Sequence, residues 1–275
     1  MSALDDAFHK LKRAKEHLEN FARNVNEAFN EKGLVYNFES YPYPKPAGTI
    51  DTRQWSLVTV FIQSAPAIKI EDAILMGEAI QNFRSALDYF AWAWYLRSGS
   101  VLTESQERQI YFPMIRDSKS FNSLLNQRLP NSPDKAFIER YQPYQSTDAG
   151  LAMYYLRTLS DTDKHRIIVP TMMLPAGGDI SLIFPKGCEI ITVIERIQLG
   201  QDMREGTKMM SVIIAGSPPS ERFKPSVNAR ATLVPVFPIG LVRPRPPEEI
   251  VAVDSALNCI GKICSEILTA AAKYF

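Results

Sequence analysis

The sequence predicts an α+β fold in which a helical bundle packs against an antiparallel β-sheet. Apolar residues recur at the three-and-four spacing of amphipathic helices in three long segments, 4–29, 69–97 and 248–275. After Pro170 the pattern changes to short apolar runs separated by glycines, which is typical of antiparallel strands. We therefore expect long N-terminal, central and C-terminal helices to form the bundle and the sheet to cover one side of it.

Residues 1–275 are expected to form a single α+β domain. The proline-rich stretch 235–247 is short and flanked by apolar residues, so no change of composition marks a flexible linker. An apolar content of 45% is enough to bury a substantial core in a chain of 275 residues. The helical part is expected mainly in 1–32, 69–166 and 248–275, and the β part mainly in 33–64 and 167–240.

The first helix is expected to be amphipathic. Glutamates dilute the basic residues of its polar face, which favours a solvated face; the alternative is a basic helix that binds nucleic acid. His9 and His17 are expected to face solvent, and Gly33 to end the helix. Its apolar positions are Leu4, Phe8, Leu11, Leu18, Val25 and Phe29.

Two strand-like segments, 34–41 and 55–63, follow and can form an antiparallel pair joined by a proline-containing loop. The segment 69–97 is apolar on most of its circumference, which is typical of a helix at the centre of a bundle. Further helices are expected at 118–126, 133–140 and 148–166, and strands at 167–174, 180–184, 189–197, 209–215 and 229–237.

The composition argues against several classes of protein. Lys and Arg number 31 against 30 for Asp and Glu, so the formal charge of +1 creates no global field toward nucleic acid or acidic membranes. Three cysteines without metal-ligand spacing, no run long enough to span a bilayer and an acidic N-terminus indicate a soluble cytoplasmic protein without a metal or other cofactor. The motifs of nucleotide-binding loops, zinc proteases and serine hydrolases are also missing.

Charged residues interrupt two of the apolar helical segments. Arg84 and Asp88 stand four apart on one face of the central helix, beside its buried stripe. The run DTDKHR occupies residues 161–166, at the end of the helix expected over 148–166. Because charges at a packed face need partners, the two groups are expected to form a polar network that ties the helices together. The expected partners are Asp161 or Asp163 for Arg84, and Lys164, His165 or Arg166 for Asp88.

A catalytic interpretation of the same residues is the alternative. A histidine beside Arg and Lys can act as acid, base or phosphate stabiliser without a metal, which is what ribonucleolytic transesterification requires. His165 would then move protons, Arg84 or Arg166 would hold the phosphate, and Asp88 or Asp163 would orient the imidazole.

Four short elements occur in order between about residues 80 and 170: NFRSALDY at 82–89, Phe112-Pro113, IERYQPY at 138–144 and DKHR at 163–166. Together they resemble a widespread group of uncharacterised bacterial proteins with an Arg-Ser-Ala-Leu-Asp-His-like helix and an Asp-Lys-His-Arg end. This resemblance brings no function with it.

The first element is also distantly similar to HEPN ribonucleases, whose bundles carry Arg, four to six residues, then His on one helix. This chain has Tyr89 where that histidine would fall. The resemblance implies either that His165 replaces the missing imidazole or that a HEPN-like bundle serves in binding or dimerisation.

Two functions are therefore expected from the sequence. The first is an interaction or regulatory module of the bacterial cytoplasm, as a homodimer through its N- or C-terminal helix or with another protein partner, and away from membranes. The alternative is a metal-independent ribonuclease that acts on RNA as a toxin or phage-defence effector.

Overall fold

The chain folds into two compact units, each built from distant parts of the sequence. The helical unit comprises Met1–Val25, Lys69–Pro170 and Phe237–Phe275, and the β unit comprises Asn26–Ile68 and Thr171–Val236. The computed structural model describes residues 3–97, 103–108, 110–128, 135–164, 166–168, 170–173, 180–184, 186–196, 204–216, 226–229, 234–237 and 251–273.

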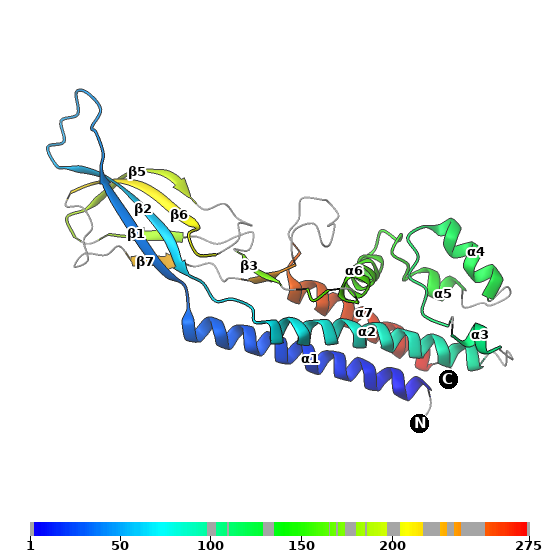
Figure 1. Cartoon of the computed structure of the whole chain (residues 1–275). Helices are drawn as coiled ribbons and strands as arrows, with labels where there is room; N and C mark the ends of the chain where they lie inside the picture. The colour runs from blue at the N-terminus through cyan, green and yellow to red at the C-terminus, as the bar shows by residue number, and fades with distance from the viewer. Residues whose placement is uncertain are drawn as a thin grey trace. The chain divides into compact units, whose positions relative to one another are not determined.

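The helical unit is organised around α2, and α6 and α7 pack against it and against each other (Figure 1). The buried residues of α2 surround most of its axis, and Ile80, Phe83 and Leu87 have no exposed surface. The predicted central helix is thus confirmed. The helices are α1 (Ala3–Lys32), α2 (Ile70–Arg97), α3 (Glu104–Glu107), α4 (Ser118–Arg128), α5 (Lys135–Glu139), α6 (Asp148–Asp163) and α7 (Val253–Ala272).

Helix α1 runs antiparallel to α2. Asn24 donates to Asp72 at 2.8 Å, and His17 lies 3.2 Å from Glu78. Residue numbers therefore decrease along α1 in the direction in which they increase along α2. The apolar positions of α1 are buried at Leu11, Leu18 and Val25, as the spacing predicts, whereas Phe8 remains 37% exposed.

The β unit contains a four-stranded antiparallel sheet in the order β1-β2-β6-β5. The central strands β2 and β6 carry most of the buried residues, and a hydroxyl pair, Thr59 and Ser211, joins them at 3.2 Å. The strands are β1 (Val35–Pro42), β2 (Trp55–Ser64), β3 (Thr171–Met173), β4 (Ile180–Ile183), β5 (Glu189–Arg196), β6 (Lys208–Ala215), β7 (Ser226–Ala229) and β8 (Val234–Val236).

The α+β class, the bundle of long helices and the antiparallel sheet are confirmed, including the pairing of the first two strands. The position of the sheet against the bundle and the single domain stay predictions. The strands after Pro170 differ most from the predicted single sheet, because β3 pairs with β8 and β4 pairs with β7 in separate two-stranded sheets. Across the described ranges, every helix is too short or too polar to cross a membrane.

Candidate functional site

Arg84 and Asp88 of α2 hold the main chain of a segment that has no regular secondary structure. The Asp88 Oδ1 atom accepts a hydrogen bond from the Phe112 N–H at 2.9 Å, and Arg84 Nη2 donates to the Phe112 carbonyl at 3.1 Å. Arg84 Nε also donates to Asp88 Oδ2 at 3.1 Å, which closes the ring of contacts. We call this arrangement the Arg84–Asp88 clamp.

The clamp satisfies backbone groups that would otherwise be buried without partners. Phe112 has no exposed surface, and Pro113 beside it has no N–H to donate. A buried main-chain donor or acceptor without a partner costs about 1–3 kcal/mol. Each charged side chain of the clamp therefore replaces a contact that a neighbouring strand would supply in a sheet.

The electrostatics of the clamp are dominated by burial. Desolvation raises the pKa of Asp88 above its ordinary value, against the opposing effects of Arg84, the Phe112 amide and Lys164. The direct contacts of Asp88 are those with Arg84 and the Phe112 amide.

The direct partners differ from those expected from the sequence. Arg84 pairs within its own helix, because Asp88 is one turn away, and not with Asp161 or Asp163. Asp161 instead lies 3.8 Å from Arg157 and 3.9 Å from Lys164, all on the same stretch of chain.

Asp163 and Arg166, the other predicted residues of this run, lie in different environments. Asp163 Oδ2 accepts from Gln81 Nε2 of α2 at 3.1 Å, so this carboxylate does connect the two helices. Arg166 is exposed, and its main-chain N–H donates to Thr162 at 3.1 Å. His165, the predicted acid–base group, lies outside the described residues.

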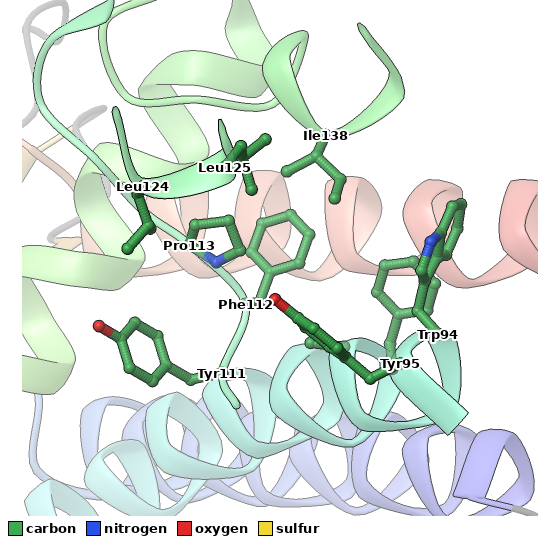
Figure 2. A pocket seen from close by; sticks show the side chains of 10 residues that line it. Trp94, Tyr95, Tyr111, Phe112, Pro113, Leu124, Leu125 and Ile138 are labelled. Carbon is green, nitrogen blue, oxygen red and sulfur yellow. The ribbon is translucent and has the colours of Figure 1, made fainter. Parts of the chain in front are cut away.

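An aromatic pocket adjoins the clamp (Figure 2). Phe112 and Pro113 pass between α2 and the short helices that carry Leu125 and Ile138 (Figure 2). The cavity volume is about 20 Å³, so this pocket is nearly filled by its own side chains and resembles a core more than a ligand site.

Farther along α2, an apolar stripe reaches the surface. Tyr89, Trp92 and Leu96 follow one another at the three-and-four spacing of one helix face. Tyr89 is 39% exposed and Leu96 is 56% exposed, while Trp92 is half-buried. We call these three residues the α2 stripe.

A polar cleft of about 440 Å³ opens between α1, α2 and the end of α6. This volume lies in the range of small-molecule sites in proteins. Among the residues that the structure describes, the cleft is lined by Lys10, Arg13, His17, Ile74, Gly77, Glu78, Gln81, Asn82, Asp163 and Ile167.

Hydrogen bonds inside the cleft fix several of these side chains. His17 Nδ1 lies 3.2 Å from Glu78 Oε2, and Arg13 Nε donates to His17 Nε2 at 3.4 Å. The side chain of His17 is only 14% exposed, so the expectation that it faces solvent is wrong. His9, by contrast, is exposed as expected.

Gly77 of α2 leaves room for the Asp163 carboxylate, and both residues line the cleft. A Cβ atom at this position would lie 2.6 Å from Asp163 Oδ1, closer than van der Waals contact allows. Asp163 could be predicted from the sequence, but the cleft could not. The sequence pattern of the cleft is a polar face on both α1 and α2, and such faces are usually solvated.

No group of three or more possible His, Cys, Asp or Glu metal ligands occurs within the described ranges. No family model, curated protein or solved structure matches the chain.

Proposed function

We propose that the chain is an interaction or regulatory module of the bacterial cytoplasm, and that its charged clamp is scaffolding. The guanidinium of Arg84 and the carboxylate of Asp88 are both engaged by Phe112 and by each other. This engagement supports a structural role, because a group that stabilises a reacting phosphate needs donors free to reach it.

The α2 stripe is the observation that carries the proposal. Tyrosine, tryptophan and leucine gathered on one exposed helix face are typical of a surface that another protein covers. We propose a second copy of the chain as the occupant, since two identical stripes can pair symmetrically. The stripe replaces the N- or C-terminal helix as the proposed dimer surface.

Sedimentation velocity over a range of protein concentrations tests this proposal. We expect the wild-type chain to dimerise and Leu96→Glu to weaken dimerisation at least about tenfold, because a buried, unpaired carboxylate opposes association. Ile50→Glu is the matched control, since Ile50 is 94% exposed in the loop between β1 and β2. A monomeric wild type, or equal effects of the two variants, would contradict the proposal.

A metal-independent ribonuclease is the second candidate. The observation that favours it is the polar cleft, where Lys10 and Arg13 face a wall that includes Asp163, two residues before His165. In this candidate His165 moves protons, and Arg166 or the cations of the cleft hold the phosphate, because the clamp engages Arg84.

A further inference from the structure

The polar cleft presents different chemistry at its two ends. His17 lies beside Glu78, near the middle of the α2 wall. Because α1 and α2 are antiparallel, Lys10 lies toward the Asn82 end of the cleft, opposite the Ile74 end. Ile74 and Asn82 are eight residues apart on α2, which corresponds to about 12 Å along the helix axis. The cleft is therefore long enough for an elongated small molecule.

The α1 wall offers a site for an anion. Lys10 and Arg13 are three residues apart and share one face of α1. His17 Nε2 accepts a hydrogen bond from Arg13 Nε, so the terminal guanidinium nitrogens of Arg13 can donate to a ligand. A guanidinium fork beside an ammonium group suits a phosphate, which accepts several charge-assisted hydrogen bonds.

The rest of the cleft combines apolar surface with a hydrogen-bond acceptor. Ile74 and Ile167 line the cleft and are 44% and 48% exposed, which leaves apolar surface for the faces of a flat ring. Asp163 also lines the cleft, and its Oδ2 accepts a hydrogen bond from Gln81 Nε2. A carboxylate fixed in this way can accept hydrogen bonds from the amino or imino groups at a ring edge.

We propose that the cleft binds a nucleoside monophosphate, with the phosphate at Lys10 and Arg13 and the base between Ile74 and Ile167 against Asp163. A free phosphate would leave the isoleucines uncovered, and a nucleoside would leave the cations without an anion. This inference goes beyond the scaffolding role of the clamp and does not depend on it, because none of the clamp residues lines the cleft.

Isothermal titration calorimetry of the purified full chain tests the inference with the common nucleoside monophosphates, the matching nucleosides and inorganic phosphate. We expect at least one monophosphate to bind about tenfold or more tightly than its nucleoside or phosphate alone, because both ends of the cleft then contribute.

Two variants distinguish the contribution of the cations to binding from that of Asp163. Arg13→Gln should weaken the monophosphate about tenfold or more and leave the nucleoside unchanged, whereas Asp163→Asn should weaken both. Lys12→Gln is the matched control for lost charge, because Lys12 is 76% exposed on the same helix and pairs with Glu16. Circular dichroism of each variant reports whether it is folded.

Three results would overturn the inference. They are absence of binding by every monophosphate at millimolar concentration, binding of inorganic phosphate as tight as that of any monophosphate, and equal effects of Arg13→Gln and Lys12→Gln. Dimerisation through the α2 stripe is measured separately, so either proposal can fail alone.

Discussion

Asp88 shows how a single carboxylate can be both costly and necessary. Its burial raises its pKa, so the ionised form is disfavoured by desolvation. The same carboxylate nevertheless accepts from the Phe112 N–H and from Arg84. Removing it would leave the buried Phe112 N–H without its acceptor and Arg84 without its ion-pair partner.

We predict that Asp88→Asn destabilises the chain by about 1–3 kcal/mol at neutral pH, since an amide nitrogen cannot accept from Arg84. The effect should depend on pH. At pH values between the ordinary pKa of 3.8 and the raised pKa of folded Asp88, the folded chain holds a proton that the unfolded chain has released. The contribution of Asp88 to the free energy of unfolding therefore falls as pH rises through that window, and the asparagine variant lacks this fall.

Urea unfolding of both proteins across the acidic range measures this difference. Asp161→Asn is the control, because the side chain of Asp161 is 58% exposed and its ion pairs are longer than 3.5 Å. A constant difference between wild type and Asp88→Asn at every pH would refute the raised pKa.

At Arg84 the sequence predicted the need for a partner but not the partner itself. Charges at a packed helix face require compensation, and this argument holds for any packed helix. The choice of Phe112 depends on a segment of irregular backbone whose hydrogen bonds leave no pattern in the sequence. The cleft could not be predicted for a similar reason, since the approach of Asp163 to Gly77 depends on how three helices pack.

Helix α6 depends on a defined start. Thr147 has an extended backbone, and its side chain accepts from the Gly150 N–H at 3.1 Å, as an N-cap residue does. This cap sets where α6 begins, and α6 carries Asp163 to the cleft.

We predict that Thr147→Ala lowers the free energy of unfolding by about 1 kcal/mol, because one N-terminal N–H of α6 loses its acceptor. Thr147→Ser keeps the hydroxyl and should restore most of the loss. Chemical denaturation of the three proteins measures the effect. Equal stability of the alanine and serine variants would show that the hydroxyl contributes nothing.

The pairing of the short strands after Pro170 was harder to predict than the helices for a physical reason. The apolar period of α2 extends over 28 residues, so tertiary packing and local pattern point to the same element. The strands β3, β4, β7 and β8 have three or four residues each, and their partners are distant in sequence. Such short runs specify strand character without specifying a partner.

The balance of charge over the whole chain bears on the choice between the two proposed functions. A formal charge of +1 gives no general attraction for RNA, so any RNA substrate would depend on local cations such as Lys10 and Arg13. The interaction module needs no such attraction, because the α2 stripe is apolar.

We predict that the wild-type chain leaves mixed RNA intact in a buffer that contains a chelator. Arg84 is engaged by the clamp, and the chain has Tyr89 where the proposed HEPN-like similarity would require a histidine. Gel electrophoresis of RNA incubated with wild type and with His165→Ala measures this. Cleavage by both proteins would indicate a contaminating nuclease, because the proposed chemistry requires the imidazole. Cleavage by wild type alone would contradict the prediction and favour the ribonuclease, with the cations of the cleft in place of Arg84.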